Sequence, residues 1–96
     1  MEITEIEAAS PLYDRALQLR YELFFKDFDL PKSVTADDLE GDSTHVALTN
    51  GDELLAYGRL SPLGDSTYRI SQIVVEPSHR RQGYAIRIVI ALIFRA

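Results

Sequence analysis

The segment from Ile73 to Leu92 constrains the fold of this chain more than any other part of the sequence. An apolar strand, Ile73 to Val75, is followed by a proline-containing turn, and residues 80–85 then open an apolar helix. The first N–H groups of a helix lack intrahelical acceptors and carry the positive end of the helix dipole. A glycine at the tightest point of the loop lets this backbone approach an anion, and two arginines beside it attract the same anion. The segment therefore predicts a phosphate or pyrophosphate site centred on residues 80–85.

The order of these residues resembles the acetyl-CoA motif of the GNAT superfamily of N-acetyltransferases. That motif runs V-x-P and then, a few residues later, R/Q-x-x-G-x-G/A. This chain has Val75-Glu76-Pro77 followed by Arg80-x-x-Gly83-x-Ala85, at the spacing that the family uses. A six-residue pattern alone is a weak signal, but the strand before it and the apolar helix after it make the match much stronger. The resemblance implies binding of acetyl-CoA or CoA and transfer of an acetyl group to a primary amine.

The resemblance also assigns the residues that would bind this cosubstrate. Main-chain groups of the last strand would pair with the pantetheine arm of CoA, and amides of the loop and first helical turn would bind its pyrophosphate. A backbone N–H near Ile73 or Val74 is the candidate donor to the oxyanion. The binding residues implied in this way are Ile73, Val74, Val75, Arg80, Arg81, Gln82, Gly83, Tyr84 and Ala85.

The sequence identifies no catalytic base or acid. Some family members carry a glutamate on the last strand, where this chain has Arg69, Ser71 and Gln72. We expect Glu76 to point to solvent, His45 to be a satisfied histidine at a strand edge, and His79 to lie in a solvated turn, although His79 could assist phosphate binding. Two histidines far apart in the sequence, and no cysteine, give no support for a metal site.

Composition limits the classes of partner. The net charge of −5 disfavours nucleic acid as a general partner, and the longest apolar run is too short to span a bilayer. The N-terminal residues lack the features of a signal peptide, and the chain has no cysteine, which together suggest a cytoplasmic protein. Four arginines, Arg69, Arg80, Arg81 and Arg87, are expected to lie near the proposed anion site. A basic mouth on an acidic protein suits a small polyanion such as CoA.

Hydrophobic periodicity and turn signals predict a strand, a helix, three antiparallel strands and a helix. The resemblance implies that they form an α/β (α+β) fold, with a mixed, mainly antiparallel sheet flanked by helices. Ser10-Pro11 is a typical helix start, and Asn50-Gly51 between apolar runs is a strong hairpin signal. The predicted elements are a strand over 1–7, a helix from 11 to about 26, strands over 45–49, 53–60 and 68–75 with a turn at 61–66, and a helix over 84–94. The connection 32–43 is polar and acidic, with room for a short helical turn.

An acidic cluster in that connection carries Asp37, Asp38, Glu40 and Asp42. Family members often contact the acceptor in this loop, so the cluster could attract a cationic amine. We prefer the interpretation that these side chains form a solvated face.

The resemblance implies a further strand, a helix and a terminal pair of strands after the helix at 84–94. We therefore expect residues 1–96 to form a single, incomplete GNAT-like domain that lacks the usual C-terminal strands and helix. From Tyr84 to Phe94 only Arg87 is polar, so apolar side chains surround this helix, and the last strand has an open edge. Both features predict a homodimer or larger assembly through the C-terminal helix and last strand. A fragment or a damaged gene product, with an exposed face that serves no purpose, is an equal alternative. The function is therefore either acetyl transfer or that of a non-catalytic, self-associating CoA-binding remnant.

Overall fold

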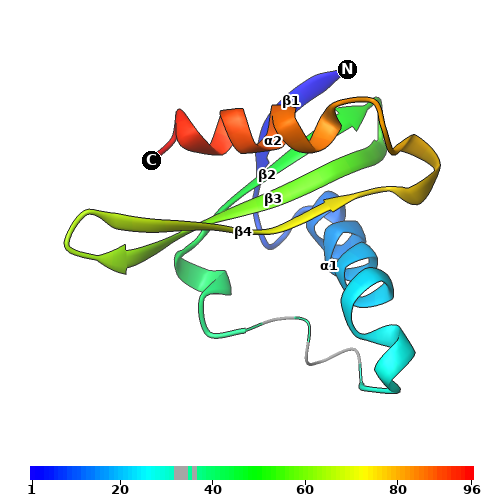
Figure 1. Ribbon diagram of the computed structural model, residues 1–96, viewed down its shortest axis with the longest axis horizontal. Coiled ribbons are helices and arrows are strands. Elements are labelled where there is room, and N and C mark those ends of the chain that lie inside the picture. The colour runs from blue at the N-terminus through cyan, green and yellow to red at the C-terminus, as the bar shows by residue number, and fades with distance from the viewer. Residues whose placement is uncertain (32–34, 36) are drawn as a thin grey trace.

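The computed structural model describes residues 1–31, 35 and 37–96. It has a four-stranded antiparallel sheet in which each strand pairs with the next one along the chain (Figure 1). This arrangement confirms the predicted α+β class. The elements are β1 (Glu2–Ile6), α1 (Pro11–Phe24), η1 (Lys26–Phe28), η3 (Glu40–Asp42), β2 (Thr44–Asn50), β3 (Glu53–Gly64), β4 (Thr67–Val75), η4 (Pro77–His79) and α2 (Tyr84–Ile93).

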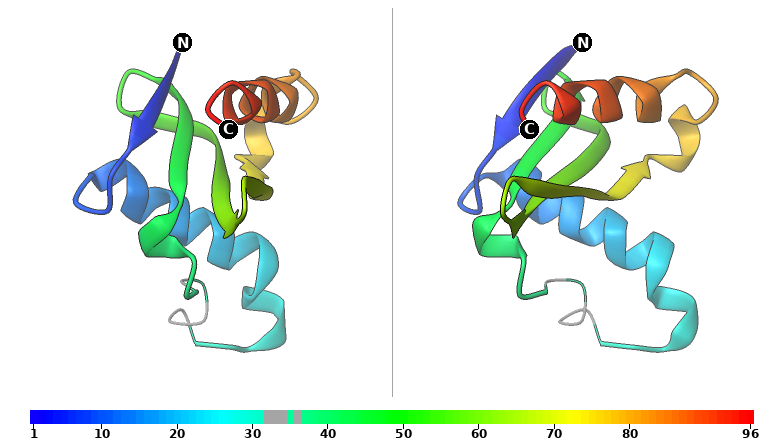
Figure 2. Two further views of the ribbon diagram at one scale, coloured as in Figure 1. Left: turned by 90° about the vertical axis from the view of Figure 1, so that its left-hand side faces the viewer. Right: turned by 60° about the vertical axis from the view of Figure 1, so that its left-hand side comes forward.

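The two long helices lie on opposite faces of the sheet (Figure 2). Ala16 and Leu19 of α1 are fully buried against one face, and Ile88 and Leu92 of α2 are fully buried against the other. The central strands are therefore covered on both sides, which explains why β3 is buried continuously instead of alternating. The sheet separates two small cores, one under each helix.

Helix α1 begins as the sequence predicts. The Leu12 N–H donates to Ser10 Oγ at 3.2 Å, and Pro11 occupies the first helical position, where no donor is needed. The helix ends at Phe24, slightly before the predicted end near residue 26, and η1 follows it. Of the predicted acidic connection, residues 32–34 and 36 lie outside the described part of the chain, and η3 is the short helical turn near its end.

The first hairpin turns at Asn50-Gly51, as predicted. The second hairpin is longer than predicted, because β3 continues to Gly64 and turns at Asp65-Ser66, where both residues have positive φ. Pro62 reads as a turn signal, but β2 pairs with β3 only as far as Leu60. Beyond Leu60 no described strand pairs with that side of β3, and a residue without an N–H is tolerated there.

Strand β4 contains a bulge, because two of its residues, Gln72 and Ile73, lie opposite a single residue of β3, Gly58. Gln72 has a φ of 57°, the left-handed conformation. The bulge shifts the alternation of side chains along the strand. As a result Ile70 and Ile73 both pack against the core under α2, although an unbroken strand would point them to opposite faces.

Helix α2 confirms the prediction that apolar side chains surround it. Its outer surface carries four exposed apolar residues: Ile86, Ile90, Ile93 and Phe94. Across residues 1–31, 35 and 37–96, every helix is too short or too polar to cross a membrane.

Candidate functional site

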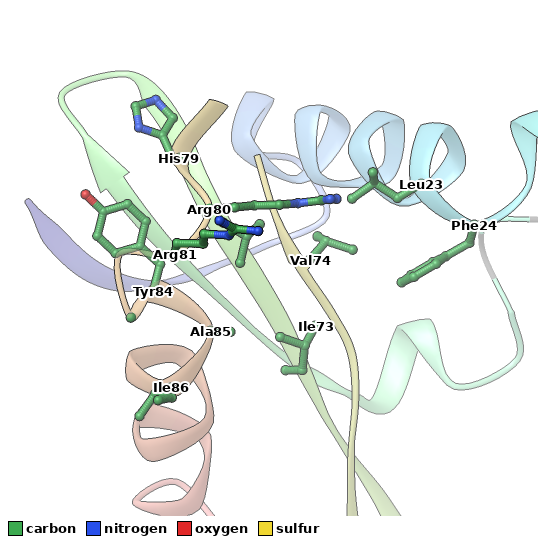
Figure 3. A pocket seen from close by; sticks show the side chains of 12 residues that line it. Leu23, Phe24, Ile73, Val74, His79, Arg80, Arg81, Tyr84, Ala85 and Ile86 are labelled. Carbon is green, nitrogen blue, oxygen red and sulfur yellow. The ribbon is translucent and has the colours of Figure 1, made fainter. Parts of the chain in front are cut away.

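A cleft of about 500 Å³ runs along β4, between the C-terminal end of α1 and the N-terminal end of α2 (Figure 3). Every residue that the sequence analysis assigned to CoA binding lines it, except Gln82, whose Oε1 accepts a hydrogen bond from Tyr84 Oη at 3.0 Å. The wall formed by Leu23 and Phe24 of α1 was not predicted. The lining residues are Leu23, Phe24, Ile73, Val74, Val75, His79, Arg80, Arg81, Gly83, Tyr84, Ala85 and Ile86.

The N-terminus of α2 opens on this cleft with unused donors. Its first helical hydrogen bond joins the Arg87 N–H to the Gly83 carbonyl at 3.2 Å. The N–H groups of Tyr84, Ala85 and Ile86 precede that bond, and no side chain in the described part of the chain caps them. The positive end of the helix dipole adds to these donors, so this terminus favours an anion.

The loop before α2 is shaped to leave room at this terminus. Arg81 and Gly83 both adopt the left-handed conformation, with φ of 66° and 75°. A side chain built at Gly83 would meet no atom within 4 Å, so the space beside it is open. Arg80 and Arg81 have exposed side chains, and neither forms a salt bridge with any described residue. Their charges are therefore available to a ligand.

The prediction that Arg69 joins this basic group is wrong. Arg69 lies near the start of β4, roughly 20 Å from Val75 at 3.3 Å per residue, and it does not line the cleft. Arg87 lies on an exposed part of α2 and is not in the cleft lining either.

The exposed edge of β4 offers backbone groups to the same cleft. The Glu76 N–H donates to the Leu55 carbonyl at 2.9 Å, which fixes the phase of the strand. Because successive residues alternate, Val74 also faces β3, whereas Ile73 and Val75 turn their N–H and C=O groups towards the open edge. An extended ligand in the cleft could pair with these groups as a strand would.

The turn between β4 and the loop is held by one ion pair and by a contact of the His79 ring with a carboxylate. Arg15 Nη2 lies 2.6 Å from Glu76 Oε2, and His79 Nε2 lies 3.4 Å from Glu53 Oε1. The prediction that Glu76 points freely to solvent is therefore wrong, because its carboxylate ties the turn to α1. His79 lines the cleft, next to the loop arginines.

On the other side of the sheet edge, α1 covers a buried polar network. Glu40 accepts from Arg20, Arg59 and Tyr13 at 2.6, 3.1 and 2.9 Å, and Asp37 accepts from Arg59 at 2.8 Å. Both arginine side chains are almost completely buried. The interpretation of the acidic cluster as a solvated face is wrong for Glu40, whose carboxylate is largely buried as the counter-ion of two buried arginines. Asp37 is exposed as predicted, although it also pairs with Arg59.

This network shifts the titration of its members. Burial alone would raise the pKa of Glu40, but the hydrogen bond and charge of Arg20 outweigh it and lower the pKa. Asp37 behaves in the same way, with Arg59 as its main partner, and its pKa is also lowered. Burial and the hydrogen bond to Glu40 raise the pKa of Tyr13 to about 12. The carboxyl groups of Glu40 and Asp37 are therefore ionised at neutral pH, while Tyr13 is neutral.

His45 belongs to the same network and not to a sheet edge. It lies on β2, an internal strand, where its ring nitrogens contact Tyr57 Oη at 2.6 Å and the Glu40 carbonyl at 2.9 Å. Both ring nitrogens of His45 have hydrogen-bond partners, as predicted. The residue lies on an internal strand, however, and not at the predicted sheet edge.

Comparison with known proteins agrees with this geometry. Residues 3–96 match the model of the Acetyltransferase (GNAT) family. The chain therefore belongs to the GNAT acetyltransferase family.

Solved structures give the same fold. An aminoglycoside 6′-N-acetyltransferase complexed with coenzyme A superposes with a TM-score of 0.79 at 21% identity, over 99% of this chain and 54% of that protein. An acyl-CoA N-acyltransferase from Pseudomonas aeruginosa gives 0.79 at 26% identity, over 99% and 68%. Escherichia coli ElaA gives 0.73 at 25% identity, over 98% and 68%. The chain thus spans about half to two thirds of the length of these relatives.

Proposed function

We propose that this chain binds acetyl-CoA in the cleft beside β4, as part of an enzyme that transfers the acetyl group to a primary amine. The observation that carries the proposal is the uncapped N-terminus of α2, which shares one cleft with the open edge of β4. The pyrophosphate would accept from amides of residues 81–86, with Arg80 and Arg81 beside it. The pantetheine arm would pair with Ile73 and Val75.

The chemistry that this arrangement supports is acyl transfer. The neutral amine nitrogen attacks the thioester carbonyl, a C–N bond forms and the C–S bond breaks. The proton lost from nitrogen passes to solvent, and CoA leaves as the thiolate. The backbone N–H of Ile73 would donate to the developing oxyanion. No carboxylate lies among the described residues that line the cleft, and we assign no general base. His79 is the titratable lining residue to test for that role first.

Calorimetry with CoA and an acetyl-transfer assay test the proposal together. We expect CoA to bind, and we expect a thiol reagent to detect CoA release with some members of a panel of primary amines. Failure of the chain to bind CoA would overturn the proposal. Binding without release on any amine would instead favour the non-catalytic alternative.

That alternative is a self-associating CoA-binding module, and the outer surface of α2 favours it. Ile86, Ile90 and Ile93 are about half exposed or more, and Phe94 is 83% exposed. Burying each side chain fully would stabilise an assembly by roughly 1.5–3 kcal/mol. The part of the open β4 edge that precedes Ile73 lies outside the proposed pantetheine site and could pair with a second copy. We propose a homodimer through these two elements, and a cytoplasmic location because the proposed cosubstrate is an intracellular metabolite.

Light scattering at micromolar concentration tests the dimer. We expect at least twice the chain mass, and Ile90→Glu should reduce it to the mass of one chain. Leu63→Glu is the matched control, because Leu63 is similarly exposed but lies on the far hairpin. A clean monomer of the unmodified chain would contradict the dimer and leave the CoA proposal intact.

A further inference from the structure

The bulge in β4 places a residue with a side chain in a conformation that normally requires glycine. Gln72 has a φ of 57° in the middle of a strand. In bulges whose first residue is left-handed, that residue is usually glycine, because a Cβ is crowded there. A non-glycine residue keeps such a conformation only where other contacts impose it.

The contact that imposes it comes from α1. Arg20 Nε donates to Gln72 Oε1 at 3.2 Å across the space between the helix and the sheet. The Arg20 side chain is fully buried, and its Nη2 is fixed by Glu40 Oε1 at 2.6 Å and by the Thr35 carbonyl at 2.9 Å. Gln72 is therefore anchored to a rigid group.

The residue that the bulge positions is Ile73, in the wall of the cleft. Its side chain packs in the core under α2, opposite Gly58, where an added Cβ would lie 2.6 Å from Ile73 Cδ1 and 2.4 Å from Ile88 Cγ2. The side chain of Ile73 is thus held by the core under α2, and the preceding residue, Gln72, is held by Arg20. The direction of its N–H and C=O groups follows from these two restraints.

We propose that Arg20 and Gln72 are positioning residues, which hold the β4 bulge so that the main chain of Ile73 meets the pantetheine arm of the ligand. This inference rests on the proposed function. The contact between Arg20 and Gln72 should affect binding of the pantetheine arm along β4. It should not affect binding of the nucleotide at the N-terminus of α2.

Two ligands separate these parts. CoA carries the nucleotide and the pantetheine arm, whereas 3′-phospho-ADP is the nucleotide part alone. The ratio of their dissociation constants, measured by calorimetry, reports the contribution of the arm. Three variants change the anchor in different ways: Gln72→Glu keeps an acceptor for Arg20, Gln72→Gly removes the side chain but tolerates positive φ, and Gln72→Ala removes the side chain and disfavours positive φ.

We expect Gln72→Ala to weaken CoA by up to about tenfold, the upper size for losing one neutral hydrogen bond between Ile73 and the pantetheine arm, with 3′-phospho-ADP unchanged. Gln72→Glu should bind CoA as the unmodified chain does, and Gln72→Gly should lie between. A purely structural role would weaken both ligands equally. If Gln72→Ala fails to fold, the amide resonance of Ile73 in Gln72→Gly provides the test, and it should shift and broaden.

Equal CoA to 3′-phospho-ADP ratios in Gln72→Ala and the unmodified chain would overturn the positioning role alone. An unchanged Ile73 resonance in Gln72→Gly would do the same. If the unmodified chain binds neither ligand, the proposed function falls and the positioning role falls with it.

Discussion

The N-termini of α1 and α2 differ in how the N–H groups of their first turns are treated. At α1 a serine caps the backbone, a proline follows, and Asp14 adds a negative charge in the first turn. At α2 a glycine precedes the helix, no described side chain caps it, and the first turn has no acidic residue. The start of α1 is capped by a side chain of the same protein, whereas the first N–H groups of α2 are left available to a ligand.

The two faces of the sheet also differ in whether their charged side chains are paired within the chain. Under α1, buried charges are matched to each other through Glu40, Arg20 and Arg59. Beside α2, Arg80 and Arg81 are exposed at the mouth of a cleft. A polar group that is paired internally stabilises the fold, and a polar group left without a partner beside a cavity suggests a ligand.

The largest effect on stability is expected on the α1 side. Glu40→Ala removes the carboxylate that two buried guanidinium groups share, and breaking a buried pair in this way costs about 3–5 kcal/mol. Asp42→Ala, in the same acidic cluster but exposed, should change the free energy of unfolding by less than about 0.5 kcal/mol. Urea unfolding of both variants makes the comparison. Equal effects would mean that the cluster is solvated after all.

The largest effect on binding is expected at the α2 terminus. Gly83→Val forces a β-branched residue into positive φ and should distort the amides that we propose to hold the pyrophosphate. Losing two such charge-assisted bonds would weaken CoA by about a hundredfold or more. Gly51→Val is the matched control, since Gly51 has a similar φ and equally open surroundings but lies in the first hairpin. It should destabilise the fold without changing the CoA dissociation constant, and unchanged affinity in Gly83→Val would remove this site.

A smaller effect on binding is expected from the loop arginine. Arg80→Ala should weaken CoA by about tenfold or somewhat more, through loss of one charge-assisted contact. Arg69→Ala should have no effect, because Arg69 lies outside the cleft. Calorimetry at two salt concentrations checks both variants, and the salt dependence should be shallower in Arg80→Ala. If both arginines matter equally, the attraction is a property of net charge and not of the cleft.

A modest effect on stability, without any effect on binding, is expected from the capped terminus. Ser10→Ala removes the acceptor for the Leu12 N–H and should cost about 1 kcal/mol of unfolding free energy. Thermal unfolding measures the loss, and CoA affinity should stay unchanged. A change in CoA affinity would show that the two termini are not independent.

The smallest effect near neutrality concerns pH. The pKa values of Glu40 and Asp37 are lowered in the fold, so their ion pairs contribute full stability above the ordinary carboxylate range, near 4. That contribution is lost as the pH falls through the folded-state pKa values. The melting temperature should therefore drop below about pH 4, and the drop should be shallower in Glu40→Gln. Identical pH profiles would exclude the network as the acid-sensitive element.

What could be predicted from the sequence is what is encoded locally. The Ser10 cap, the Asn50-Gly51 turn and the succession of strand, loop and helix at the cleft each depend on residues that are neighbours in the chain. The same holds for the apolar circumference of α2. These features are recognisable because backbone geometry restricts which residues can occupy them.

What could not be predicted depends on partners far apart in the sequence. Glu40 looks like one member of a solvated charge run until the fold brings it to Arg20 and Arg59. Glu76 looks free until α1 brings Arg15 beside it. The bulge at Gln72 could not be recognised from the sequence, because it has no glycine at the position with positive φ. The contact of Gln72 with Arg20, which is distant in the sequence, takes the place of glycine there.

The central claim is that the free donors of α2, and not those of α1, bind the ligand. The most direct test is a titration of the ¹⁵N-labelled chain with CoA, followed through the backbone amide resonances. We predict saturable shifts at Gly83, Tyr84, Ala85 and Ile73, with the resonances of Leu12 and Tyr13 unchanged. Shifts centred on the start of α1, or no saturable shift at the start of α2, would contradict the account.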